Sequence, residues 1–366
     1  MKDNKRYEIA LSLIPGLDIS IVRSLMELTG SVKYIFTDKH ISKISELKES
    51  VKENLLNKEY LEKADKEIEF CEKYKLKALF IEDPDYPQRL LECSDAPLIL
   101  YSRGDIDYNA KKIVSIVGTR KATIHGEELT EKIVYDLSKH IPNLIVVSGL
   151  AFGIDICAHK SAMKHDLKTA AVLAHGFQEI YPPLHRNHAI DIILHGCLIT
   201  EFPSGTPSLP YQFLKRNRII AGLSDACIVI ESAKQGGSMK TAENALSYNR
   251  ELFACPGRPT DIWSNGCNSL IKDNRAILAE SAEDIIKGMN WDITSYSKDK
   301  NQRLFPNITD NQQKVYDSLP SGEQKNISEI VYESKLSISE VLSDLMQMEM
   351  LDLVRSMPGG YYLKKL

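Results

Sequence analysis

Glycine-rich and hydroxyl-rich segments follow three apolar runs of the sequence, and their residue types suit the binding of an anion. Glycine lets the backbone approach a ligand closely, hydroxyl groups donate hydrogen bonds to phosphate oxygens, and arginine adds a charged fork. The residues concerned are Gly118, Thr119, Arg120 and Thr123 in the first segment, Gly149, Ala151 and Gly153 in the second, and Gly237, Ser238 and Thr241 in the third. At any one segment, a glycine that merely ends a strand is an equal explanation. Three such segments together favour a phosphate site.

A cluster of cations and aromatic rings follows a fourth apolar run. The sequence EFPSGTP at 201–207 precedes Tyr211, Phe213, Lys215, Arg216, Asn217 and Arg218. Cationic side chains next to aromatic rings suit a flexible single strand, because every base has a face for stacking and every nucleotide carries a phosphate. The simpler alternative is that Phe213 lies in the core.

The two arginines of this cluster are expected to act differently. On a helix, Arg216 and Arg218 point about 200° apart. We therefore expect Arg216 to neutralise phosphates together with Arg120. Arg218 is expected to pair internally, with either Glu201 or Glu231.

The elements that position these residues follow an alternating pattern from residue 112. Apolar, β-branched runs are separated by helical stretches of ten to twenty residues; the runs lie at 112–118, 143–149, 169–174, 197–202, 226–232 and 251–257. Near-continuous apolar strands that alternate with helices are typical of a parallel sheet covered on both faces. The pattern predicts an α/β, Rossmann-like, doubly wound core, in which ligands bind at the carboxyl ends of the strands.

Smaller domains are predicted on either side of this core. Residues 1–80 show short helices around Pro15-Gly16, which resembles a helix-hairpin-helix or SAM-like domain, although a small packing domain explains the pattern equally well. The core spans 81–292 and starts with a Pro- and Asp-punctuated stretch at 83–106 that reads as a docked linker. A polar linker at 293–305 leads to a winged-helix domain at 306–366. The third helix of that domain, SISEVLSDLMQMEM, has no Lys or Arg, which favours protein contact over DNA binding.

Composition favours a soluble cytoplasmic protein without a membrane span or a metal. The chain has 366 residues, 43% hydrophobic and 26% charged, and its seven cysteines never form a CxxC pair. The net charge of −4 excludes a generally basic DNA coat but leaves room for a local basic groove. His185, His188 and His195 lack a carboxylate or cysteine at ligand spacing, so histidines that lie on the surface or that support other site residues are the better interpretation.

Six motifs in order resemble the DNA-processing protein A (DprA/Smf) family. They are VGTRKATIHG, SGLAFGIDICAH, EFPSGTP, RNRIIAGLS, GGSMKTA and ACPG, and the resemblance runs from about residue 86 to 287. It implies a homodimeric single-stranded DNA-binding protein that protects incoming DNA and loads the RecA recombinase during natural transformation. It also implies no catalysis and no cofactor. Carried over by position, the DNA groove would include Arg120, the loop at 149–153, Phe213 and the segment 216–218.

The sequence departs from the family pattern at several positions. His125 replaces a usual tyrosine, and Ala174-His175 stand where a glycine is common. Pro210, three residues before Phe213, occupies a place where a basic residue is frequent, which removes one expected phosphate contact.

Two further expectations concern the end of the core. GGSMKTAEN resembles the PGGxGTxxE loop of nucleotide-processing phosphoribohydrolases, with Glu243 near their acidic residue, so an enzyme of that class is the alternative function. The unit at 266–287 carries Leu270, Ile271 and Ile277 near the edge of the sheet. They are predicted to form a dimer contact, whereas packing against the sheet is an equal explanation.

Overall fold

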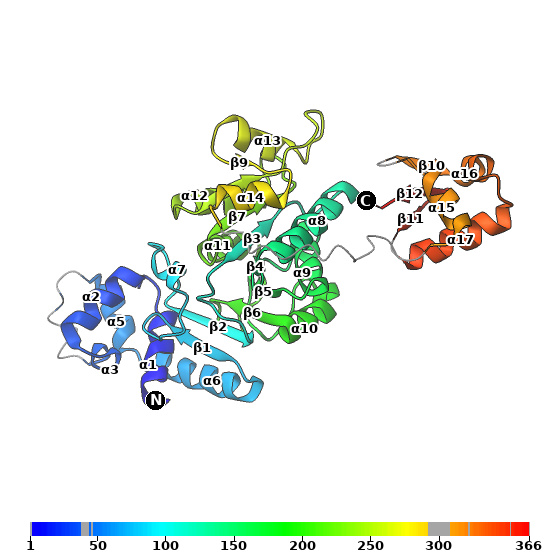
Figure 1. Ribbon diagram of the computed structural model, residues 1–366. Coiled ribbons are helices and arrows are strands. Elements are labelled where there is room, and N and C mark those ends of the chain that lie inside the picture. Colours follow the sequence, from blue (N-terminus) through cyan, green and yellow to red (C-terminus); the bar gives the residue numbers. More distant parts are fainter. Residues whose placement is uncertain are drawn as a thin grey trace. The chain divides into compact units, whose positions relative to one another are not determined.

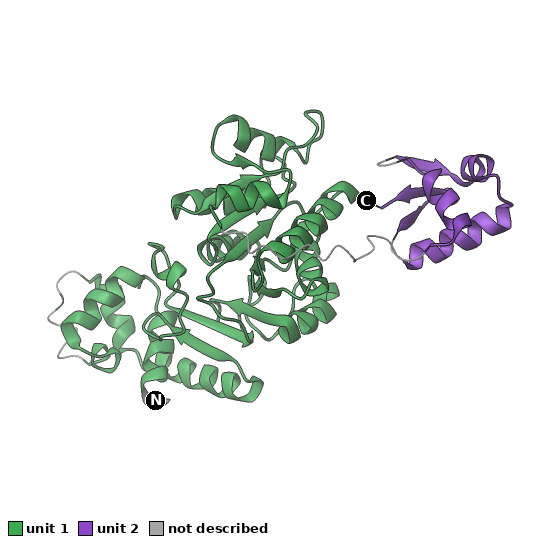
Figure 2. Ribbon diagram, in the orientation of Figure 1, with its two compact units in different colours: residues 1–295 green, residues 296–366 purple. Residues whose placement is uncertain are grey.

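A nine-stranded sheet forms the centre of the first of two compact units, which span Met1–Ser295 and Tyr296–Leu366 (Figures 1 and 2). The structure is a computed structural model and describes residues 2–37, 44, 47–291, 308–320, 323–351 and 353–365. Among these residues, no helix is long and apolar enough to cross a membrane.

The strand order of the sheet is β1-β2-β6-β5-β4-β3-β7-β8-β9. The strands are β1 (Lys77–Phe80), β2 (Ile99–Gly104), β3 (Ile113–Val117), β4 (Ile145–Ser148), β5 (Lys168–Val172), β6 (Gly196–Thr200), β7 (Ala226–Val229), β8 (Glu251–Ala254) and β9 (Ile277–Leu278). All pairs from β6 to β9 are parallel, whereas β1 with β2 and β2 with β6 are antiparallel. The predicted parallel sheet is confirmed for β3 to β8, which are the six predicted strands, whereas the antiparallel strands β1 and β2 were not predicted.

Helices cover both faces of this sheet, as Figure 1 shows. Alternate residues of β3 divide between two apolar clusters, with Val114 and Ile116 in one and Ile113 and Val117 in the other. The first face is covered by α8 (Ile124–His140), α9 (Ile154–Lys164), α10 (Arg186–His195) and α14 (Ala282–Gly288). The second is covered by α11 (Pro210–Gly222), α12 (Gly237–Ser247) and α13 (Asn265–Lys272).

The linker predicted at 83–106 is wrong, because that segment contains β2. The apolar run Leu98–Tyr101 is buried, and β2 pairs antiparallel with β6. Proline and aspartate flank this run without interrupting it, so they mark the turns on either side of a strand.

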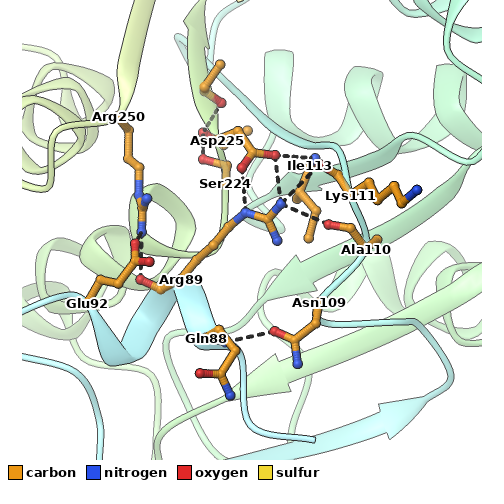
Figure 3. Close-up of polar contacts among 12 residues, drawn as sticks. Gln88, Arg89, Glu92, Asn109, Ala110, Lys111, Ile113, Ser224, Asp225 and Arg250 are labelled. Atoms are coloured by element: carbon orange, nitrogen blue, oxygen red, sulfur yellow. Dashed lines mark hydrogen bonds and ion pairs between the residues drawn. The ribbon is translucent and has the colours of Figure 1, made fainter. Parts of the chain in front are cut away.

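Arg89 links the segment before β2 to the amino-terminal ends of the central strands (Figure 3). Arg89 of α7 (Gln88–Leu91) makes two bonds to Asp225, with Nε 2.6 Å from Oδ1 and Nη2 2.9 Å from Oδ2. Asp225 Oδ2 also accepts a hydrogen bond from the Ile113 N–H at 2.8 Å, and Arg89 donates to the Ala110 carbonyl at 2.8 Å. The two side chains therefore fix the starts of β3 and β7 together.

The N-terminal helices are α1 (Lys2–Leu13), α2 (Ile19–Thr29), α3 (Val32–Ile35), α5 (Glu49–Leu56) and α6 (Glu59–Tyr74). Asp18 caps α2 by accepting from the Ile21 N–H, and Gly30 ends it with a φ of 75°. The charged stretch that follows contains α5 and α6 and leads into β1.

The second unit contains α15 (Asp310–Asp317), β10 (Gln324–Asn326), α16 (Ile327–Ser334), α17 (Ile338–Met350), β11 (Val354–Met357) and β12 (Tyr361–Lys364). Its strands form an antiparallel sheet in the order β10-β12-β11. The predicted three helices and hairpin are present. The linker predicted at 293–305 lies outside the described residues.

Candidate nucleic-acid interface

A cavity of about 320 Å³ opens where β3 and β7 end side by side. This is the point at which the strand order reverses direction, where open α/β sheets bind their ligands. Ten of the fourteen predicted DNA-binding residues line it: Gly118, Thr119, Arg120, Ala151, Phe213, Arg216, Asn217, Gly237, Ser238 and Thr241. The structure thus brings together three loops that are distant in sequence.

Close backbone contact joins the first two loops of the cavity. Gly153 has a φ of 75°, and a Cβ placed there would lie 2.2 Å from the carbonyl oxygen of Thr119. The Ile154 N–H donates to that same oxygen at 3.2 Å. Gly153 does not line the cavity but allows the loop after β4 to rest on the loop after β3.

Thr123 has a structural role in place of the predicted phosphate contact. Its hydroxyl donates to Glu231 Oε1 at 2.5 Å, and its backbone N–H donates to Glu231 Oε2 at 2.9 Å. The hydroxyl also accepts from the Gly126 N–H, which caps α8. Thr123 is therefore bound to Glu231 and does not line the cavity.

The N-terminus of α12, where the sequence predicts an anion contact, lines the cavity. A Cβ built on Gly237 would meet nothing within 4 Å, so the backbone is open there. The first turn has no acidic residue, and the helix dipole makes this end positive. Asn217 Nδ2 donates to the Gly237 carbonyl at 3.1 Å, and the Ser238 hydroxyl lies 2.7 Å from that of Ser232. These bonds hold the turn in place.

Two arginines contact the ring of Phe213, and they differ in burial. The Arg120 guanidinium is exposed and lies 5.2 Å from the ring centroid, whereas that of Arg216 lies at 6.0 Å. Arg216 is only 4% exposed and donates to the Val172 carbonyl and to Asn217 Oδ1. Arg216 lines the cavity but is buried beside the Val172 carbonyl of β5 and Asp155 of α9, so its predicted phosphate contact stays a prediction.

The buried carboxylate of Asp155 and the guanidinium of Arg216 both lie next to Gly149. A Cβ on Gly149 would lie 2.3 Å from Asp155 Oδ2 and 2.7 Å from Arg216 Nη1. Burial lowers the pKa of Arg216 to about 10, and Asp155 opposes that shift. Burial raises the pKa of Asp155, and Arg216 opposes the rise. Gly149 leaves room for this pair and does not line the cavity.

A buried histidine holds the carbonyl of Gly149. His159 Nε2 lies 2.6 Å from that oxygen and Nδ1 lies 2.6 Å from the Thr169 hydroxyl. Burial lowers the pKa of His159 to about 4, so the ring is neutral at pH 7.

The remaining cations of α11 lie on its other side. Arg218 Nη2 is 2.6 Å from Glu201 Oε2, and the two side chains are 12% and 8% exposed. The predicted internal pairing of Arg218 is confirmed, with Glu201 as the partner. Lys215 lies 3.1 Å from the same oxygen and does not line the cavity.

The residues of this region that the sequence analysis did not predict include Lys121, Trp263 and, outside the cavity lining, Tyr181. Lys121 and Trp263 line the cavity, and Trp263 is one of only two tryptophans. The ring of Tyr181 meets that of Phe213 edge-on, with centroids 5.6 Å apart. The sequence feature that could have indicated Tyr181 is its place before two prolines, in the loop after β5.

Other predicted residues fall away from the cavity. Glu243 pairs with Lys240 at 3.1 Å and is half exposed, so it supplies no carboxylate to the cavity. His185 Nδ1 lies 3.0 Å from the Leu150 carbonyl, and its ring packs against Phe152. Within the described residues, no group of three potential metal ligands occurs.

The predicted dimer residues do not share one environment. Leu270 is 1% exposed and belongs to the core, which favours the packing alternative for it. Ile271 packs partly against the same cluster. Ile277 on the edge strand β9 is 41% exposed.

Comparison with known proteins decides the family. The sequence model of the DNA recombination-mediator protein A family matches residues 77–290. This chain belongs to that family. The matched range covers all nine strands of the large sheet, because it starts at β1 and ends beyond β9.

Members of the DNA recombination-mediator family with similar sequences include two Smf proteins. The Escherichia coli protein is 32% identical over 288 residues, which are 75% of this chain and 74% of that protein. The Synechocystis protein is 39% identical over 201 residues, and the match spans 54% of this chain and half of its relative.

Two solved structures of this family are also similar. DNA processing protein A from Streptococcus pneumoniae matches with a TM-score of 0.67 at 31% identity, over 77% of this chain and 97% of that chain. DNA processing protein A from Helicobacter pylori, described with its single-stranded DNA binding mode, matches with a TM-score of 0.54 at 28% identity, over 60% and 98%.

Proposed function

We propose that this protein binds single-stranded DNA through the cavity between β3 and β7, without catalysis. The observation that carries the proposal is the exposed Arg120 guanidinium over Phe213, beside the open N-terminus of α12. A cation and a helix N-terminus suit phosphates, and aromatic rings suit unpaired bases. The single-stranded DNA binding described for the Helicobacter pylori relative supports the same ligand.

Comparison of single-stranded and duplex DNA tests this proposal. We expect tighter binding of an oligo-dT strand than of a duplex of equal length in a mobility shift, because paired bases do not reach the aromatic rings. Equal affinity for both forms would contradict the proposal. Release of free base from nucleoside monophosphates would instead support the phosphoribohydrolase alternative.

We further propose that the bound strand is protected and passed to RecA during natural transformation, in the cytoplasm. Membership of the recombination-mediator family supports this role, and all seven cysteines are free thiols, as in a reducing compartment. We expect RecA to assemble faster on single strands in the presence of this protein. An unchanged assembly rate would contradict the loading role.

We propose a homodimer that uses the exposed edge strand β9. Ile277 and Leu278 are 41% and 43% exposed on a strand with one free edge. Ile277→Glu is expected to give a folded monomer in light scattering. Leu270→Ala serves as a comparison, because this core residue should lower stability without changing the mass of the particle.

The flanking helices fit two smaller modules. We propose that α1 and α2 form a helix-hairpin-helix or SAM-like unit, and that the second unit is a winged-helix module. Since α17 has no Lys or Arg and carries Glu340, Asp344 and Glu349, the winged helix is suited to protein contact.

A further inference from the structure

Tyr181 presents an exposed aromatic ring next to Phe213 at this interface. It is 44% exposed, whereas Phe213 is partly buried. The Phe213 ring already has the guanidinium groups of Arg120 and Arg216 within 6.0 Å of its centroid and the edge of Tyr181 at 5.6 Å. Phe213 therefore supports its neighbours more than it offers a free face.

A buried histidine, His175, holds the backbone of Tyr181. Its backbone N–H donates to His175 Nε2 at 3.2 Å, and His175 is 1% exposed, with Nδ1 2.8 Å from the Gly176 carbonyl. The bond to His175 holds the backbone of Tyr181, and the edge-on contact with Phe213 holds its ring, so little conformational freedom is lost when a base stacks on it.

We propose that Tyr181 is a base-stacking platform, with Phe213 as the pedestal that holds both this ring and Arg120. The inference rests on the proposed binding of single strands and names the group that meets the base. A base on Tyr181 lies next to a phosphate near Arg120, since both side chains contact the same phenyl ring.

The geometry of the two rings also selects the conformation of the strand. The planes of Tyr181 and Phe213 are inclined by 66°. A base that lies flat on Tyr181 is therefore tilted away from any group that lies flat on the Phe213 ring, such as a stacked guanidinium. Strands that enter this site must be locally unstacked, so flexible oligo-dT binds better than self-stacked oligo-dA.

The first experiment measures binding of oligo-dT to the full chain by fluorescence anisotropy over a salt series. Tyr181→Ala is expected to weaken binding roughly 5- to 140-fold, which corresponds to loss of one stacked base. The dependence on salt should stay unchanged, because stacking releases no counterions. Tyr181→Phe should bind like the unchanged protein, since the ring and not the hydroxyl group stacks.

Tyr74 provides a matched control. It is 40% exposed, its ring packs on Phe70 with centroids 4.4 Å apart, and Lys73 lies over it, but it lies on α6 and its ring contacts Phe70 instead of Phe213. Tyr74→Ala should leave binding unchanged. If Tyr181→Ala is folded and binds like Tyr74→Ala, the platform is disproved while single-strand binding stands. If the unchanged protein does not bind oligo-dT, the proposed function itself fails.

A second experiment avoids substitution altogether. Ultraviolet irradiation of the unchanged protein with oligo-dT containing 5-iododeoxyuridine should crosslink Tyr181, identified by peptide mass spectrometry. Crosslinks only to Tyr211 or Phe152, which are also exposed, would overturn the assignment. Equal affinity for oligo-dT and oligo-dA of the same length would overturn the requirement for an unstacked strand.

Discussion

At the scale of single residues, Arg120 is a cation of the cavity that can meet a phosphate. It is exposed at the cavity, whereas Arg216 is buried and Arg218 is paired with Glu201. Arg120→Ala is expected to weaken binding of every single strand about equally and to lower the salt slope by about 0.7, the value for one phosphate contact.

Arg103 is a suitable control for this measurement. It is exposed on β2 and does not line the cavity, so Arg103→Ala should leave both affinity and salt slope unchanged. An Arg120→Ala protein that keeps the full slope would show that Arg120 does not neutralise a phosphate.

His159 makes stability depend on pH. Burial lowers its folded-state pKa to about 4, so between that value and the ordinary histidine range the unfolded chain binds more protons than the folded chain. The free energy of unfolding should therefore fall as the pH drops, by about 2 kcal/mol from this residue between pH 7 and pH 5.

His159→Gln should remove this contribution from urea unfolding curves at the two pH values. Part of the dependence should remain, because burial also lowers the pKa of His175. His195→Gln, which changes an exposed histidine, is the control. An unchanged pH dependence in His159→Gln would contradict the buried neutral ring.

The arginines show what sequence can and cannot provide at this scale. Helical spacing correctly separated Arg216 from Arg218 and assigned an internal partner to Arg218. It did not reveal that Arg216 is buried, because its burial depends on the Val172 carbonyl and on Asp155, which come from other segments. Tyr181 was missed for the same reason, since its partner Phe213 lies on a distant helix.

At the scale of elements, the bond between Arg89 and Asp225 fixes α7 to the starts of β3 and β7 (Figure 3). The two side chains are 14% and 23% exposed. Arg89→Ala leaves a partly buried carboxylate without its cation and should lower the free energy of unfolding by about 1.5–3 kcal/mol. The DNA affinity of the folded fraction should be unchanged, because these bonds lie at the amino-terminal ends of β3 and β7 and the cavity lies at their carboxyl ends.

Lys77 gives the matched comparison for urea unfolding. Its ion pair with Asp105 has side chains 52% and 86% exposed, so Lys77→Ala should change stability by less than about 0.5 kcal/mol. Equal stability losses in the two variants would argue against a special role for Arg89.

The strands differ in how visible they are in the sequence. The six central strands were predictable, because a parallel strand buried on both faces is a nearly continuous apolar run. β9 has two exposed residues, and β1 begins with an exposed lysine, so neither carries such a run. Their place in the sheet depends on their neighbours β8 and β2, which local patterns do not encode.

At the scale of the whole molecule, DNA binding should reside in the first compact unit. α17 of the second unit contains no cation, whereas the cavity lies wholly within the first. A chain that ends after Trp291 should therefore bind single strands within about twofold of the full chain, as a loss of a phosphate-binding module would cost far more. A large loss of affinity on this truncation would assign DNA contacts to the second unit.

Removal of the N-terminal residues should have the opposite result. A chain of residues 106–291 lacks β2, so the edge of β6 would be unpaired and prone to association. It also lacks Glu67, whose carboxylate accepts from the Ser204 N–H at 2.9 Å and from its hydroxyl at 2.8 Å. These bonds hold the loop that leads into α11, the helix that carries Phe213. We expect this fragment to aggregate in sedimentation and to lose single-strand binding, whereas a monodisperse fragment with full affinity would show that the core of the interface needs neither β2 nor Glu67.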